Sequence, residues 1–132
     1  MSTTQHRSAC TYTIETSQNI TYICVTGVVD GTSLRKILEE IWTGKDYQHP
    51  CILWDFRVSV AGLGIEDVRR ISQFVKNQGD ARGYGRVAMV VDHHLNEQYA
   101  RMYELLSQSL PFEVKTFRDV GSAEGWLREL FE

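Results

Sequence analysis

The sequence predicts an α/β protein whose core is a five-stranded, mostly parallel sheet with the element order ββαβαβαβα. Two observations lead to this class. After residue 50, short apolar runs alternate with stretches whose apolar residues recur at helical spacing, which is the pattern of parallel strands joined by crossover helices. Before residue 30, two runs rich in β-branched residues are separated by a short polar segment, which predicts a hairpin whose first strand is an antiparallel edge.

The hairpin and the first helix occupy the N-terminal part of the chain. Residues 12–16 alternate apolar and polar side chains and residues 20–29 are rich in β-branched ones, so both are expected to be strands. Residues 17–19 supply the turn between them. Side-chain oxygens in Asp30–Ser33 can cap a helix. The apolar stripe of that helix follows directly and consists of Leu34, Ile37, Leu38 and Ile41.

The rest of the chain alternates regularly between strands and helices. Strands are expected over 51–56, 87–91 and 112–117. The apolar stripes that predict the helices after these strands are Ile65, Val68, Ile71, Phe74 and Val75; Leu95, Tyr99, Met102 and Leu106; and Ala123, Trp126, Leu127, Leu130 and Phe131. Ser122 is expected to cap the last helix. Trp42 and Tyr103 fall just off the centres of their stripes, so one of them could border a groove or a subunit interface.

Length, charge and hydropathy narrow the class of partner. With 132 residues the chain suits one domain, and we expect a mobile tail over residues 1–10 followed by a single domain over 11–132. A net charge of −3 lacks the basic excess that binding to nucleic acid requires. The longest uninterrupted apolar run, residues 87–91, is far too short to span a bilayer, which argues against an integral membrane protein.

The three cysteines indicate a reducing environment. Their number is odd and no C-x-x-C spacing occurs, so neither a disulfide framework nor a thiolate metal site is expected. Cys24 and Cys51 each lie within an apolar run and are predicted to be buried, unreactive thiols. A cytoplasmic location is therefore expected, since free thiols are typical of that compartment.

Ionisable residues gather where three of the predicted strands end. In a parallel sheet, ligands bind beyond the carboxyl ends of the strands, where loops and helix N-termini meet. Arginines in such a place can clamp a carboxylate or phosphate through paired hydrogen bonds. The residues predicted to form this strand-end set are Asp55, Arg57, Asp92, His93, His94 and Arg118. The alternative is that they are ordinary solvated charges, with Asp55–Arg57 and Arg118–Asp119 as surface ion pairs.

No arrangement of residues in the sequence predicts catalysis, a metal or a cofactor. His93 and His94 are adjacent in an extended segment, so their rings point in opposite directions and do not converge on one ion. Asp92 beside His93 is a conceivable acid–base pair, but any carboxylate next to a histidine would suggest the same. Gly62 and Gly64 lack the further glycine or the lysine of a nucleotide-binding loop. We therefore expect a protein that is not an enzyme.

Several phrases along the chain carry a family resemblance. They are Ile52–Arg57, Arg86–Val91, Tyr99–Tyr103, Phe117–Asp119, Ala123 and Trp126–Leu127, and the resemblance extends from Thr11 to Leu130. In this order they resemble the STAS fold of small bacterial proteins. More narrowly, the chain is similar to the sporulation anti-sigma-factor-antagonist-like family, which is also compared with CRAL-TRIO lipid-binding domains. The resemblance implies a STAS-like domain that acts by binding.

One departure from that class concerns regulation. In STAS anti-sigma antagonists an Asp-Ser pair begins the helix after the third strand, and that serine is phosphorylated to control partner binding. Residues 58–65 here hold a single hydroxyl, Ser59, early in the segment and without a neighbouring Asp. A phosphate needs donors from the helix N-terminus. The comparison with the family therefore implies that the switch is missing.

Two functions stay open from the sequence. The first is a non-enzymatic binding or regulatory module that acts through a protein partner or through self-association as a homodimer. The second is a carrier or sensor of a small anionic or amphipathic, lipid-like ligand, with its polar head at the strand ends and its tail among helical aromatics. A closed core with a flat charged edge would favour the first. An elongated apolar cavity opening near Arg57 or Arg118 would favour the second.

Overall fold

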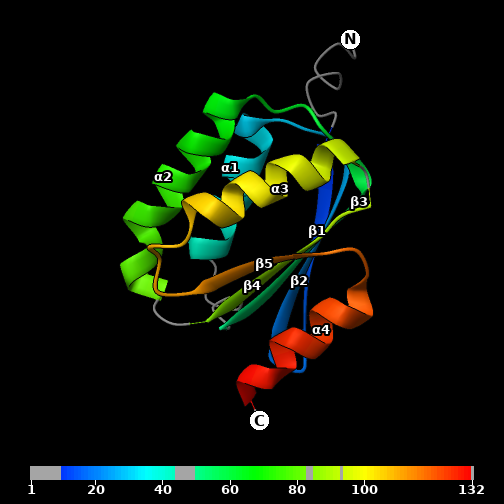
Figure 1. The fold of residues 1–132 in the computed structure, drawn as a ribbon, viewed down its shortest axis with the longest axis vertical. Helices are drawn as coiled ribbons and strands as arrows, with labels where there is room; N and C mark the ends of the chain where they lie inside the picture. Colours follow the sequence, from blue (N-terminus) through cyan, green and yellow to red (C-terminus); the bar gives the residue numbers. More distant parts are fainter. Residues whose placement is uncertain (1–9, 44–49, 83–84, 93, 132) are drawn as a thin grey trace.

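The computed structural model describes residues 10–43, 50–82, 85–92 and 94–131, which form a five-stranded sheet with helices on both faces (Figure 1). The strands are β1 (Cys10–Ser17), β2 (Ile20–Val29), β3 (Cys51–Ala61), β4 (Arg86–Val90) and β5 (Glu113–Phe117). Their spatial order follows the chain, with β1 antiparallel to β2 and all other neighbours parallel. This confirms the predicted fold class. Of the tail predicted over residues 1–10, residues 1–9 lie outside the described residues, and Cys10 is already the first residue of β1.

Three helices cover one face of the sheet and one covers the other (Figure 1). The helices are α1 (Gly31–Thr43), α2 (Ile65–Arg82), α3 (His94–Leu106) and α4 (Val120–Arg128), followed by the short 3₁₀ helix η3 (Glu129–Phe131). Parallel strands that are neighbours in chain order are joined by crossovers of the same hand, so α1, α2 and α3 lie on the same face. The helix after the last strand, α4, covers the opposite face. Among the described residues, no helix is long and apolar enough to cross a membrane.

The β1–β2 hairpin is closed by a two-residue turn. Ser17 pairs with Ile20, and the residues between them, Gln18 and Asn19, have φ angles of 51° and 68°. Positive φ at both central positions matches the turns whose twist suits a hairpin. The predicted turn over residues 17–19 is therefore confirmed.

Buried apolar residues form one cluster on each face of the sheet. The cluster under α1, α2 and α3 contains long and aromatic side chains, among them Ile37, Trp54, Met89 and Phe112. The fully buried cluster under α4 has fewer members and includes several small side chains. Its members are Ile20, Cys51, Leu53, Ala88, Val90, Ala123 and Leu127. Each face thus buries its own set of alternating strand residues.

Strand β3 is longer than predicted. The sequence pattern indicated a strand over 51–56, but β3 continues to Ala61, while its pairing with β4 stops at Asp55. Beyond that point β3 pairs only with β2, after a bulge that places Phe56 and Arg57 opposite Val25. The edge of residues 56–61 that a longer β4 would have covered faces the start of α3 instead.

Two local predictions were wrong. The N-cap of α4 is Asp119 rather than Ser122, since the Asp119 carboxylate accepts hydrogen bonds from the Ser122 amide at 2.7 Å and the Ser122 hydroxyl at 2.9 Å. Cys51 is buried as expected, but Cys24 is only half-buried. Cys24 pairs with Asp55 across β2 and β3, on the part of the sheet that α4 does not cover. None of the three cysteines forms a disulfide.

Candidate ligand-binding site

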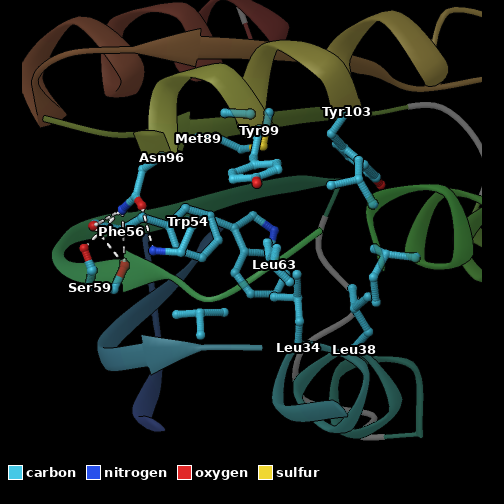
Figure 2. A pocket seen from close by; sticks show the side chains of 15 residues that line it. Leu34, Leu38, Trp54, Phe56, Ser59, Leu63, Met89, Asn96, Tyr99 and Tyr103 are labelled. Carbon is cyan, nitrogen blue, oxygen red and sulfur yellow. Dashed lines mark hydrogen bonds between the residues drawn. The ribbon is translucent and has the colours of Figure 1, made fainter. Parts of the chain in front are cut away.

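An apolar cavity lies between the sheet and the three helices on its larger face. It offers about 90 Å³ to the centres of water-sized molecules, and it is lined from β3, β4, α1, α2 and α3 (Figure 2). A single water needs roughly 10–15 Å³ of such space, so this cavity can hold several waters or one small organic molecule. Several lining side chains, including Leu34, Leu63 and Tyr99, are only half-buried. The cavity therefore communicates with the surface.

Strand β3 supplies the aromatic floor of the cavity. Trp54 and Phe56 are two residues apart and so point to the same face of the sheet. Their rings are stacked, with centroids 5.5 Å apart and planes 8° from parallel. Trp54 is only 6% exposed. The sequence pattern placed both residues in a strand but gave no indication that they face a space rather than a filled core.

Helix α3 supplies the opposite wall. Asn96, Tyr99, Ala100 and Tyr103 recur at helical spacing and all line the cavity (Figure 2). The expectation that Trp42 or Tyr103 borders a groove is confirmed for Tyr103, whereas the side chain of Trp42 lies outside the described residues. The stripe that predicted a core-facing helix therefore faces a cavity along much of its length.

Asn96 closes the polar end of the cavity and replaces the missing part of β4. Its side-chain amide donates to the carbonyl oxygens of Phe56 (3.2 Å) and Ser59 (2.9 Å), and its side-chain oxygen accepts from the Ala61 amide at 2.7 Å. Asn96 is 6% exposed, so these buried backbone groups depend on it. Sequence reasoning missed this role, because an Asn near a helix start is common as a turn residue.

The described part of the cavity lining carries no charge. Its side chains are apolar or aromatic except Ser59 and Asn96, and both of these are hydrogen-bonded within the protein. The Ser59 hydroxyl donates to the Phe56 carbonyl at 2.8 Å and is buried. Such a space suits an uncharged molecule, since a buried ion without a partner is strongly disfavoured.

The strand-end set is only partly assembled. Asp55 and Arg57 form a two-pronged ion pair, with Nη2–Oδ2 at 2.8 Å and Nε–Oδ1 at 2.9 Å. The hydrogen bonds from Arg57 lower the pKa of Asp55, and Asp55 in turn raises the pKa of Arg57. Asp92 and Asp119 also act on Arg57 electrostatically. Arg57 is therefore surrounded by carboxylates of its own chain.

The remaining members of the set lie toward α3. Arg118 pairs with Glu97 at 2.6 Å rather than with Asp119, and the His94 ring contacts the Gln98 amide at 3.3 Å. His93 lies outside the described residues. None of the described members of the set lines the cavity. Within the described parts of the chain, no group of three or more metal-ligating side chains converges on one point.

A second feature is an exposed apolar patch at the outer ends of β2 and β3. We call it the outer valine patch, and it consists of Val28, Val58 and Val60, which are 47%, 61% and 47% exposed. Val28 pairs with Val60 across the two strands, and Val58 pairs with Thr26. These residues point away from the cavity, whose lining includes the intervening Ser59 and Ala61.

Comparison with known proteins gives a likeness of fold. No family model matches the chain, and no curated protein matches it. A DUF3478-family protein with a SpoIIAA-like fold from Shewanella loihica PV-4 is 21% identical, with a TM-score of 0.57 over 90% of this chain and 94% of that one. An anti-sigma factor antagonist from Mycobacterium paratuberculosis is 14% identical, with a TM-score of 0.62 over the same shares of the two chains. The protein therefore has the STAS-type fold that the sequence resemblance predicted.

Proposed function

We propose that this protein is a non-enzymatic binding module that holds a small, mostly apolar molecule in the cavity between the sheet and α1, α2 and α3. The observation that carries the proposal is the cavity itself. Protein interiors contain few voids larger than one water, and this space of about 90 Å³ has an almost entirely carbon lining. Two stacked rings, Trp54 and Phe56, are kept beside it.

The cavity favours the second of the two functions left open by the sequence, in an altered form. The expected ligand had an anionic or polar head at the strand-end set and an apolar tail among the helices. Arg57 and Arg118 are instead engaged by Asp55 and Glu97. The ligand that we propose is therefore contained in the cavity, and the strand-end set is left as a candidate contact for a partner.

Regulation by phosphorylation of Ser59 is not part of the proposal. Ser59 lies within β3, is 4% exposed and donates its hydroxyl hydrogen to the Phe56 carbonyl. The helix α2 starts only at Ile65, so a phosphate on Ser59 would lack the donors of that helix N-terminus.

The test uses toluene as a probe and Ala100→Leu as a blocking variant. Ala100 lines the cavity from α3 and is 7% exposed, so a leucine there extends into the free space and keeps good helix propensity. We expect toluene to shift the methyl resonances of Val68 and Met89 in the wild type, and to shift them little in Ala100→Leu. Equal binding by both proteins would contradict the proposal.

A control variant separates the cavity from the strand-end set. Arg57→Ala combined with Arg118→Ala removes both arginines that were expected to hold a ligand, without touching the cavity lining. We expect toluene binding to be unchanged in this double variant. If it were lost while the fold is retained, the binding site would lie at the strand ends.

Binding of a protein partner is a second candidate, favoured by the outer valine patch. The similar structure from Mycobacterium paratuberculosis is that of an anti-sigma factor antagonist, a kind of regulator defined by its action on another protein. Exposed valines on neighbouring strands are suited to bury apolar area against such a partner. On this model the patch and the cavity are two sites, one for the partner and one for the ligand.

A photo-reactive amino acid at position 58 tests the second candidate in the cells that make the protein. Leu105 on α3 is 68% exposed and gives a control position away from the patch. We expect a discrete adduct from position 58 but not from position 105, and we expect Val60→Asp to abolish binding of the same partner when it is purified. An adduct with the mass of two copies would mean self-association. Absence of an adduct specific to position 58 would reject the patch.

A further inference from the structure

We propose that the cavity selects an uncharged ligand that carries a hydrogen-bond acceptor, such as a carbonyl oxygen on a compact apolar body, and that Trp54 Nε1 is the donor that recognises it. This inference rests on the proposed function, because it concerns the chemistry of the ligand in the same cavity. It also departs from the sequence-based expectation of an anionic or lipid-like ligand.

The first support is a hydrogen-bond donor of the cavity lining that has no partner among the described residues. Trp54 is 6% exposed, and its indole N–H has no hydrogen bond to any residue that the structure describes. A Trp N–H that faces an apolar space has few hydrogen bonds to bulk water, so an acceptor that reaches it there gains a favourable hydrogen bond. Figure 2 shows the indole nitrogen of Trp54 directed into the middle of the cavity rather than into the sheet. An indole N–H is a donor only, so the group that it awaits is an acceptor.

The second support is the hydroxyl of Tyr99. The Tyr99 ring descends from α3, and Figure 2 shows its hydroxyl directed into the same cavity. No hydrogen bond to this hydroxyl occurs within the described parts of the chain. In contrast, Asn96 and Ser59 at the other end have their polar groups occupied by β3. Among the described lining residues, the polar groups left for a ligand are therefore an N–H and an O–H, which together suit an oxygen with two lone pairs.

The third support is the absence of charge in the lining. No Lys, Arg or His whose side chain the structure describes contributes to it, so a carboxylate or phosphate would enter without a counter-ion. The volume of the cavity limits the size of the ligand. Space for several waters corresponds to a molecule of about nine non-hydrogen atoms rather than to a long acyl chain.

Three probes of nearly the same shape test the inference. Acetophenone carries a carbonyl oxygen, α-methylstyrene replaces that oxygen by a CH₂ group, and benzoate carries a charge. We expect acetophenone to bind about three- to tenfold more tightly than α-methylstyrene, which is the effect of one net hydrogen bond, and benzoate to bind more weakly than either. In ¹H–¹⁵N spectra the Trp54 indole proton should move downfield with acetophenone and not with α-methylstyrene.

Variants assign the preference to its donors. Trp54→Phe removes the N–H but keeps an aromatic ring, and it should reduce the preference for acetophenone to less than about twofold. Tyr99→Phe, which removes a half-buried hydroxyl, provides a milder second variant should Trp54→Phe fold poorly, and it should lower the preference in part. Trp126→Phe, on α4 outside the cavity lining, is the matched control and should leave the preference unchanged.

The possible failures are distinguishable. If both neutral probes bind equally, or benzoate binds best, the inference about ligand chemistry is wrong while the cavity remains a binding site. If no probe binds and Ala100→Leu behaves like the wild type with toluene, the proposed function itself is wrong. A preference for acetophenone that survives both Trp54→Phe and Tyr99→Phe would also overturn the inference, because another donor would then recognise the oxygen.

Discussion

The two faces of the sheet show two ways of covering the same set of strands. Under α4, small residues such as Ala88, Ala123 and Cys51 let the helix lie close to the strands, and Leu127 is fully buried among them. Under α1, α2 and α3, long aliphatic and aromatic side chains from several elements meet over the sheet and leave a cavity of about 90 Å³. A single helix needs only a small apolar stripe to close its face, whereas three helices meeting over one sheet must also fill the space between them.

The two faces also differ in how the backbone N–H and C=O groups of the strands are hydrogen-bonded. On the α4 face, the strands that the helix covers are paired with their neighbours along the covered length. Near the cavity, α3 contributes side chains to strand edges: Asn96 binds β3 beyond the end of β4, and Glu104 accepts from the Thr116 amide of β5 at 2.9 Å. Side-chain bonds to a strand edge discourage pairing with another chain there. They also tie the cavity wall to the sheet.

The largest expected effect is a difference in thiol reactivity between two cysteines on the same face of the sheet. Cys51 lies under Leu127, to whose carbonyl its thiol donates at 3.5 Å, while Cys24 is half-buried and is not part of the cluster under α4. We expect a thiol reagent to modify Cys24 in the native state and Cys51 only when the α4 face opens, with rates that differ by about 10³-fold or more. Burial and the nearby Asp55 raise the pKa of Cys24, so its modification should accelerate with rising pH.

Peptide mass spectrometry at successive times measures both rates in a Cys10→Ser background. Leu127→Ala should narrow the difference, because it loosens the cover over Cys51 while leaving Cys24 as it is. Similar rates at the two positions in the otherwise unchanged protein would mean that α4 detaches easily.

A matched pair of Leu→Ala substitutions measures the packing on each face. Leu127 on α4 is 0% exposed in a filled cluster, and Leu38 on α1 is 6% exposed but borders the cavity. We expect Leu127→Ala to lower the free energy of unfolding by about 4 kcal/mol and Leu38→Ala by about 2 kcal/mol, since atoms next to a void lose fewer contacts. Denaturant unfolding of the ligand-free proteins gives both values. Equal losses would indicate that the cavity is filled in solution.

Substitution of Asn96 tests whether the cavity wall depends on hydrogen bonds rather than on packing. Asn96→Ala leaves the buried carbonyls of Phe56 and Ser59 and the Ala61 amide without their partner. We expect a loss of about 2–3 kcal/mol in the free energy of unfolding. Asn96→Asp keeps the acceptor for Ala61 but places a carboxylate against two carbonyl oxygens, so at neutral pH it should be at least as destabilising. A near-neutral effect of both variants would show that water replaces the amide without difficulty.

The comparison also shows what a sequence pattern can predict. Periodicity identified the element order and the stripe of α3, and alternation predicted the strand that holds Trp54. Both patterns report only that a side chain faces inward. Whether it meets another side chain or a void depends on how far α1 and α3 stand apart, which is a property of several elements together. The cavity could therefore not be derived from any one segment.

Other errors have similarly specific physical causes. The outer part of β3 contains Val58 and Val60, which have strand propensity, but the glycines at 62 and 64 made the whole segment resemble a loop. Cys24 has apolar neighbours in sequence, but its burial depends on which part of the sheet α4 crosses, and α4 packs on Cys51 and Leu53 instead. The sequence suggested Asp119 as an ion-pair partner of Arg118, whereas the pairing with Glu97 depends on the position of α3.

The smallest expected effect is a pH dependence confined to the α4 face. Tyr22 on β2 donates to Glu124 of α4 at 2.6 Å, and burial together with this hydrogen bond raises the pKa of Tyr22 from 10.0 to about 12. Below pH 10 the phenol is protonated in both the folded and the unfolded chain, so its contribution to stability is fully present. Between pH 10 and 12 the unfolded chain loses the proton while the folded one keeps it, and stability falls.

Tyr22→Phe should therefore be slightly less stable than the wild type at neutral pH, with a difference that shrinks as the pH rises through this interval. Absorbance titration of the two proteins isolates the transition of Tyr22, which should have its midpoint near 12. A midpoint near 10, or a stability difference that stays constant from pH 9 to 12, would mean that the bond to Glu124 does not hold α4 against the sheet.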